Sequence, residues 1–474
     1  MQKLHRGLPL VVGLAFFMEQ LDATIIAPAL PDMAAALGTD PLTLSLAMTV
    51  YLLCGVAFIP IGGPLASRWG TRTVFQAAIA LFVASSVMCA FASSLPVLCA
   101  ARALQGMAAA LMVPVGRTAL VRQTPPGELV AALAWMITPA MLGPLLGPPL
   151  GGLITTLLSW HWIFLINVPI GLAGLWAAAR FVPQIHLEAD TAFDLPGWLL
   201  LACILAFLIG GLELVRHGAP TVPCAVLATL FLLASGAYAR RANRRARAML
   251  DFALLRTRTF RTSFVSGSLL RVGYGALPFL LPLMLQVGLG FSALESGMTL
   301  LATGAVALLT KTQTTWMLRR WGFRRVLLAN GIACSVALAI CGLCRVSWGL
   351  PAIALVASIA GLVRAVQFNA IAAVAYADLP PQKIGAATTL NTMAQQLSIM
   401  LGITVATLVV DWSARAQGRS APTPDDFSAA FYVVAAISAL AIPSYLALRA
   451  DAGARLSGNR SQNASQTPRA DGSR

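Results

Sequence analysis

The strongest constraint in this sequence is a series of apolar runs, each about 20 residues long, that recurs from one end of the chain to the other. About 20 apolar residues is the length at which an α-helix crosses the ~30 Å hydrocarbon core of a bilayer. The 474 residues are 58% hydrophobic and 11% charged, unlike a soluble protein. No polar stretch between the runs is long enough for a separate catalytic domain of ~100 residues. The sequence therefore predicts an all-α polytopic membrane protein and excludes a soluble globular enzyme.

Fourteen of these runs are candidate transmembrane helices. Their approximate ranges are 8–30, 43–66, 74–93, 96–120, 131–155, 160–181, 196–215, 220–239, 262–287, 293–316, 325–346, 350–375, 389–411 and 427–448. Most of the 33 Lys and Arg residues fall in alternate loops, on the side that carries both termini. Cytoplasmic loops of membrane proteins hold this excess of basic residues. We therefore expect both termini to be cytoplasmic, in a multi-pass protein of the inner membrane, and explain the net charge of +16 by topology rather than by binding to nucleic acid.

An internal repeat suggests how the helices are organised. The segment RWGTRTV at 68–74 recurs as RWGFRRV at 320–326, each time between the second and third span of a half. Topology alone can also produce a basic turn with glycine, which is the alternative. The repeat predicts two six-helix halves, a parallel-repeat arrangement found in transporters. We expect an N-terminal half at 8–181, two inserted helices at 196–239, a basic cytoplasmic loop at 240–261, a C-terminal half at 262–448 and a disordered cytoplasmic tail at 449–474.

The fifth predicted span contains the run GPLLGPPLGG at 143–152. In a helix interior proline costs ~3 kcal/mol and glycine ~1 kcal/mol relative to alanine, so another interaction must offset this composition. Small residues let membrane helices approach closely, and proline creates bends. The run predicts a tightly packed, bent hinge between moving bundles, with close packing alone as the alternative. The predicted hinge residues are Gly143, Pro144, Gly147, Pro148, Gly151 and Gly152.

With its spacing, this run resembles the antiporter motif of the major facilitator superfamily. Other segments resemble the fourteen-span drug:proton antiporter branch of that family, the EmrB/QacA type. They are LDATIIAPALP at 21–31, GPLASRWGTR at 63–72, RALQG at 102–106 and SWHWIFLINVPIG at 159–171. The resemblance implies two six-helix halves plus two central helices, and proton-coupled export.

The segment GPLASRWGTR resembles the family's loop motif between the second and third spans, which implies a gating role. Gly63, Arg68, Gly70 and Arg72 match the motif. Ser67 stands where the family usually has aspartate, which puts one charge contact of the outward-closed state in doubt.

Two acidic residues lie inside the first span. Glu19 and Asp22 are three residues apart, hence on one helical face, where two neighbouring carboxylates resist ionising together. Asp22 lies about 21 Å from the cytoplasmic end of the span, deep in the membrane. We expect this pair to carry protons. Arg102 in the fourth span is a candidate partner for Asp22, and the resemblance implies a relay role for it; a fixed ion pair that never titrates is the alternative.

The second half contributes candidates for a substrate cavity. Arg271 and Arg364 lie near the middle of the ninth and twelfth spans, and Tyr274, Asn369 and Gln395 are polar or aromatic groups inside spans. Two arginines in a central cavity favour an anionic or zwitterionic substrate unless an acidic residue neutralises them. Packing between helices is the alternative for the uncharged groups.

These observations predict a proton-coupled secondary transporter that exports small hydrophobic or drug-like compounds by alternating access. Its expected partners are the lipid bilayer, the substrate and protons; whether a periplasmic adaptor joins it stays open. No phosphate-binding loop, metal-binding pattern or catalytic cluster occurs, so we expect no enzyme activity, no metal and no cofactor. The alternatives are a proton-coupled exporter of one anionic metabolite and a membrane sensor that does not transport.

Overall fold

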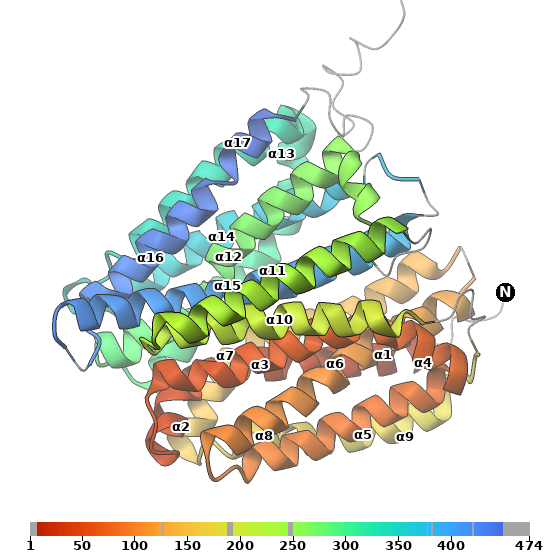
Figure 1. The fold of residues 1–474 in the computed structure, drawn as a ribbon, viewed down its shortest axis with the longest axis horizontal. Helices are drawn as coiled ribbons and strands as arrows, with labels where there is room; N and C mark the ends of the chain where they lie inside the picture. The colour runs from red at the N-terminus through yellow and green to blue at the C-terminus, as the bar shows by residue number, and fades with distance from the viewer. Residues whose placement is uncertain are drawn as a thin grey trace, which may run out of the picture. The chain divides into compact units, whose positions relative to one another are not determined.

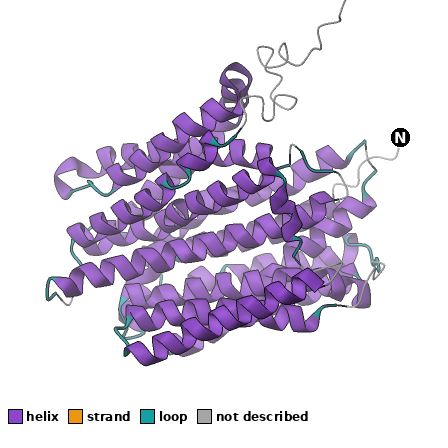
Figure 2. Ribbon diagram, turned by 45° about the horizontal axis from the view of Figure 1, so that its top comes forward, coloured by secondary structure: helices purple, strands orange, loops and turns teal. Residues whose placement is uncertain are grey.

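The computed structural model describes residues 7–125, 127–186, 193–244, 250–376, 378–380, 383–419 and 421–448. Within these ranges the chain forms helices joined by short turns, and there is no strand (Figure 2). Thirteen described helical segments are long and apolar enough to cross a membrane, and a shorter apolar helix at Ala293–Ala307 falls on the predicted tenth span. The expectation of an all-α polytopic fold is therefore confirmed. The predicted tail at 449–474 and part of the predicted basic loop, 245–249, lie outside the described residues.

The first six predicted spans are built from nine α-helices and two short 3₁₀ turns (Figure 1). They are α1 (Gly7–Ile25), η1 (Ala27–Ala29), α2 (Leu30–Ala36), α3 (Pro41–Phe58), η2 (Ile59–Ile61), α4 (Gly62–Trp69), α5 (Thr71–Ala90), α6 (Leu95–Gln123), α7 (Leu129–Leu157), α8 (Trp162–Leu165) and α9 (Asn167–Phe181). Helix α1 packs against α7 and α9, and α5 packs against α6. Side chains such as Met18, Phe75, Phe82 and Met112 fill the resulting core. Helix α1 thus lies against the long helices α6, α7 and α9.

The remaining spans begin with two helices that separate the predicted halves. They are followed by longer helices, in the order α10 (Leu195–Arg216), α11 (Thr221–Arg244), η3 (Phe252–Arg256), α12 (Arg258–Leu283), the π-turn η4 (Met284–Gly288), α13 (Ala293–Cys341), η5 (Val346–Trp348), α14 (Gly349–Ala375), α15 (Ile384–Ala416), α16 (Pro424–Ala439) and α17 (Ile442–Leu446). Helices α10 and α11 pack on each other, and α10 also packs on α3. Leu199, Val226 and Leu232 on this pair are exposed, as expected of side chains that face acyl chains.

The internal repeat recurs in the backbone as well as in the sequence. Gly70 has φ 82° and ψ 155°, and Gly322, its counterpart in the second copy, has φ 75° and ψ 165°. This region of backbone space is open almost only to glycine. At Gly322 the next helix resumes at once, so the predicted tenth and eleventh spans form one run, α13, with a sharp break inside it.

The chain forms two compact units. The first contains Met1–Leu250, Pro278–Leu301 and Ile403–Phe427, and the second contains Asp251–Leu277, Ala302–Gly402 and Ser428–Arg474. Helices α12, α13 and α15 each contribute residues to both units. The end of α12, the start of α13 and the end of α15 are therefore packed with the N-terminal helices.

Candidate functional site

Asp22 lies at the centre of a buried polar cluster in the first unit. Its Oδ2 atom is 2.6 Å from Nη1 of Arg102, which joins α1 to α6. Asp22 is 1% exposed and Arg102 is 0% exposed. The structure thus brings together the two residues that the sequence suggested as partners. A buried ion pair is stable only when further hydrogen bonds satisfy its remaining atoms, so its neighbours matter.

Neutral side chains complete the shell around Asp22. Gln105 Nε2 and Asn167 Nδ2 both donate to Asp22 Oδ1, at 2.8 Å and 3.0 Å. The same two amide groups also reach the hydroxyl oxygen of Ser86, at 2.8 Å and 3.3 Å. Arg102 Nη1 donates to Gln105 Oε1 at 2.5 Å. Helices α1, α5, α6 and α9 each supply at least one member, so the cluster links these four helices.

Aromatic rings close the other side of this cluster. The guanidinium of Arg102 lies 4.1 Å from the ring centroid of Tyr51 and 6.0 Å from that of Phe164. The Nε atom of Arg102 and the hydroxyl of Tyr51 are buried and have no hydrogen-bond partner among the described residues. Aromatic faces attract a cation and exclude water, which strengthens the nearby charge interactions. The cluster is therefore a deeply buried ionic site.

Glu19 is the second carboxylate of this region. It lies on α1 less than one turn before Asp22, close enough for the two charges to interact, and its Oε2 atom is buried without a hydrogen-bond partner among the described residues. None of the described cations forms a salt bridge with it, whereas Asp22 has Arg102. The two predicted proton-binding residues thus sit in different electrostatic surroundings.

The glycine-rich run of α7 packs directly on α1. A Cβ atom at Gly143 would lie 2.7 Å from the Cβ of Gln20, one at Gly147 would collide with Thr24 Oγ1, and one at Gly151 would collide with the carbonyl oxygen of Ile25. These glycines are four residues apart, so they form one face of α7. The close approach explains why a costly composition is retained in this helix.

The same run also contacts the start of α13. A Cβ at Gly152 would collide with the carbonyl oxygen of Ala293, and one at Gly297 would collide with that of Pro148. Nearby, Gln286 Nε2 donates to the carbonyl oxygen of Pro28 at 3.1 Å. Helix α7 continues unbroken through Pro144 and Pro148, and its role as a hinge stays a prediction.

The loop motif after α4 is tied to the segment that follows α9. Arg72 Nε donates to the carbonyl oxygen of Val182 at 2.5 Å, and the positive φ of Gly70 forms the turn between α4 and α5. The hydroxyl of Ser67 donates to the carbonyl oxygen of Pro64 at 2.8 Å, within its own helix. Gly63 and Arg68 are exposed, and Arg68 makes no hydrogen bond or ion pair among the described residues. The structure thus anchors Arg72 but leaves Arg68 free for other contacts.

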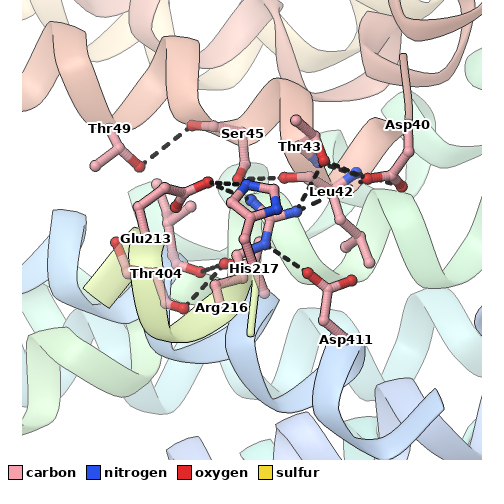
Figure 3. A network of polar contacts seen from close by, with 12 residues as sticks. Asp40, Leu42, Thr43, Ser45, Thr49, Glu213, Arg216, His217, Thr404 and Asp411 are labelled. Carbon is pink, nitrogen blue, oxygen red and sulfur yellow. Dashed lines mark hydrogen bonds and ion pairs between the residues drawn. The ribbon is translucent and has the colours of Figure 1, made fainter. Parts of the chain in front are cut away.

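A second charged network, which the sequence did not reveal as one site, surrounds Arg216 at the end of α10 (Figure 3). Its guanidinium contacts Asp411 of α15 at 2.5 Å, Glu213 at 3.0 Å and Asp40, before α3, at 3.7 Å. It also donates to Thr43 Oγ1 at 3.1 Å. The Arg216 side chain is only 1% exposed. From the sequence, an arginine at the end of a predicted span cannot be told apart from an ordinary basic loop residue. Only the fold therefore reveals this network.

The predicted substrate residues lie in the second unit. Arg271 of α12 and Arg364 of α14 belong to neighbouring helices, and Tyr274 contacts Phe368 of α14 with ring centroids 6.3 Å apart. Asn369 and Gln395 are exposed. Whether these residues line one cavity stays a prediction. In the described part of the chain no group of His, Cys, Asp or Glu could hold a metal ion.

Ser86, Asn167 and Arg216 are the site residues that sequence reasoning missed. Ser86 carried no signal, because single hydroxyl groups are common in membrane helices. Asn167 did carry one: it lies in the segment SWHWIFLINVPIG, already noticed as a motif, at the first residue of α9.

Comparisons with known proteins bear on the family and the fold of this chain. A family model described as Major Facilitator Superfamily matches residues 12–403 and 263–470. A putative multidrug resistance protein, MdtD, from Citrobacter koseri is 36% identical over 402 residues, covering 84% of this chain and 85% of that protein. Its counterpart from Cronobacter sakazakii is 37% identical over 404 residues, with the same coverage. A solved structure of the POT family transporter PepTSo aligns with a TM-score of 0.69 at 12% identity, covering 98% of this chain and 99% of that one, and so resembles it in fold.

Removing one partner of the buried pair should destabilise the protein more than removing both. Breaking a buried ion pair leaves an uncompensated charge and costs about 3–5 kcal/mol. We therefore expect Arg102→Gln to melt at a clearly lower temperature in detergent than the double variant Asp22→Asn/Arg102→Gln. Equal melting temperatures for the single and double variants would show that the charge pair is not what holds the cluster together.

The glycine face of α7 makes a second prediction. Gly151→Ala places a methyl group against the backbone of α1 and should lower the melting temperature by several degrees, since overpacking costs about 1–3 kcal/mol. Gly236→Ala on α11 is the matched control, because a Cβ there meets open space. A Gly151→Ala variant as stable as the control would contradict the tight α1–α7 contact.

Proposed function

Because the chain belongs to the major facilitator superfamily, we propose that it is a proton-coupled secondary transporter that exports small hydrophobic or drug-like compounds across the inner membrane. The relatives named for multidrug resistance, which align over most of both chains, support this substrate class. The basic side of the predicted loops, with both termini, is the cytoplasmic side in this proposal. An ion gradient supplies the energy, at ~2.3 kcal/mol per charge per 100 mV. The protein acts as a transporter rather than as an enzyme.

The observation that carries the proposal is the buried cluster around Asp22. A charged carboxylate is costly at membrane depth, and ionisable residues placed there usually have a function. In the proposed cycle, a proton that arrives at Asp22 cancels its negative charge and weakens its attraction to Arg102. A proton that arrives at Glu19 instead removes the repulsion between the two carboxylates. Since α1, α5, α6 and α9 share this cluster, its protonation changes the packing of the helices that the cluster joins.

Alternating access also needs contacts that close one side of the protein. The Arg216 network joins α10 and the start of α3 to the end of α15, which belongs to the other sequence half. The glycine contacts between α7 and the start of α13 likewise join helices from the two predicted sequence halves. In the proposed topology these contacts lie on the periplasmic side. We therefore assign them to a periplasmic gate that is closed in this structure, with α7 as the element about which the gate moves.

The function is tested with purified protein in proteoliposomes that contain a pH-sensitive dye. Asp22→Asn should abolish proton flux evoked by a lipophilic cation, because the amide cannot exchange a proton. Asp32→Asn is the matched control: it is the same substitution on the exposed side of α2, and it should leave the flux intact. The double variant Asp22→Asn/Arg102→Gln keeps the cluster neutral and should also lack flux. Gradient-driven flux at the wild-type rate in a folded Asp22→Asn protein would refute the assignment.

The gate makes a separate prediction. In a background without native cysteines, spin labels at Ala36 and Ala416 report the separation between the ends of α2 and α15. Arg216→Gln removes the cation that holds Asp411, so we expect the share of long label distances to rise about twofold. Arg122→Gln, at an exposed arginine near the end of α6, serves as the control and should change nothing. An unchanged distance distribution in Arg216→Gln would contradict the role of this network as a gate.

A further inference from the structure

Two arginines inside the membrane region of the second unit lack a counter-charge. Arg271 is 5% exposed, and its Nη1 atom is buried without a hydrogen-bond partner among the described residues. Arg364 likewise forms no hydrogen bond or ion pair with any described residue. Both lie at least about 16 Å from either end of their helices, too far for an arginine side chain to reach the membrane surface. Arg271 is buried at this depth, whereas Arg364 is partly exposed.

The surrounding sequence explains why these charges stay unpaired. The second unit contains no Asp or Glu in residues 252–277, 302–377, 379–402 or 428–448. The titratable side chains that interact electrostatically with Arg271 are the phenols of Tyr376 and Tyr445, and those that interact with Arg364 are Tyr274 and Cys334. None of these neighbours carries the negative charge that an intramembrane arginine requires. The helices of this unit therefore cannot neutralise either residue by themselves.

The position of the Arg271 side chain is built into the fold. Its Nη1 atom lies only 2.8 Å from where a Cβ of Gly267 would be, so the side chain folds back along α12 over a glycine that leaves room for it. The hydroxyl of Ser263 donates to the carbonyl oxygen of Ile371 at 2.9 Å and holds α12 against α14 at this level. A guanidinium placed in this way is ordered before any ligand arrives.

An aromatic wall accompanies the two charges. The Arg271 guanidinium lies 5.3 Å from the ring centroid of Phe368, one turn of α14 beyond Arg364. The ring of Tyr274 meets Phe368 edge-on, and its hydroxyl donates to the carbonyl oxygen of Cys334 at 2.9 Å, which fixes the ring. Guanidinium groups recognise carboxylates and sulfonates through paired hydrogen bonds, and aromatic rings stack on apolar ligands.

We propose that Arg271 and Arg364 form a subsite for the acidic group of an amphipathic organic anion, such as an aromatic carboxylate or sulfonate. The ligand supplies the missing negative charge, and Phe368, which buried Tyr274 holds in place, contacts its apolar part. This inference rests on the proposed transport function and extends it, since it adds organic anions to the exported compounds. It also assigns different tasks to the two units: the first holds the acidic residues, and the second holds the substrate's charge.

The test measures equilibrium binding to the purified full-length protein in lipid nanodiscs. Three radiolabelled probes share one apolar body: naphthoate, naphthylmethanol and naphthylmethylammonium. Wild-type protein should bind naphthoate at least tenfold more tightly than the alcohol. Arg271→Gln and Arg364→Gln should each remove most of that preference without weakening the binding of the alcohol, and Arg271→Lys should retain part of it. Arg319→Gln, at an exposed arginine of α13, is the matched control and should behave as wild type.

The results test the anion subsite separately from the proposed proton coupling. The subsite is overturned if naphthoate binds wild-type protein no better than the alcohol does. It is also overturned if naphthoate binds the folded Arg271→Gln and Arg364→Gln variants as well as it binds wild type. Cation-evoked proton flux in proteoliposomes would in either case still support the proposed function. Charge-selective naphthoate binding without any proton flux would support the subsite and refute the proton coupling. A parallel loss of naphthoate and alcohol binding in both variants, with unchanged melting temperature, would show that the arginines shape the helices rather than bind the anion, and would also overturn the inference.

Discussion

A bilayer offers no water to a charged side chain, so each intramembrane charge in this protein must be balanced by another group. The structure shows two solutions to this constraint and one exception. Asp22 and Arg102 balance each other inside a shell of amides and aromatic rings. Arg216 gathers acidic residues from three segments near the ends of helices. Arg271 and Arg364 have no acidic partner among the described residues of their own unit, which leaves their charge for the proposed anionic ligand to balance.

How far the sequence predicts the site depends on how rare each signal is. Charges inside apolar runs are rare, which is why Asp22 and Arg102 could be chosen from the sequence alone. Ser86 and Asn167 are neutral, and neutral polar groups occur in many membrane helices, so only their distance from Asp22 reveals their role. Arg216 is the last residue of α10, a position that the sequence does not distinguish from a loop. Its partners come from α3 and α15, which the sequence gives no reason to bring together.

The fold was more predictable than the site because it follows from the length and spacing of the apolar runs. The main difference is α13, where two predicted spans join through Gly322 without a loop. The paired glycines Gly70 and Gly322 show that the repeat preserves a backbone conformation. The first spans of the two predicted halves differ in charge, since the first span holds Glu19 and Asp22 whereas the ninth holds Arg271. The fourth spans agree, since the fourth holds Arg102 and the twelfth holds Arg364. The two predicted halves thus share a backbone turn and one arginine position but differ in their acidic residues.

The position of Arg216 bears on how a protein with fourteen predicted spans relates to one with twelve. Helices α10 and α11 look like an insertion, because the two predicted halves would be complete without them. Yet Arg216 on α10 is the cation that Asp411 and Asp40 share. Excising the pair would leave two acidic residues on α15 and before α3 facing each other without a cation. Deleting α10 and α11 would therefore also remove the cation that balances Asp411 and Asp40, so the remaining twelve predicted spans would need a replacement for Arg216.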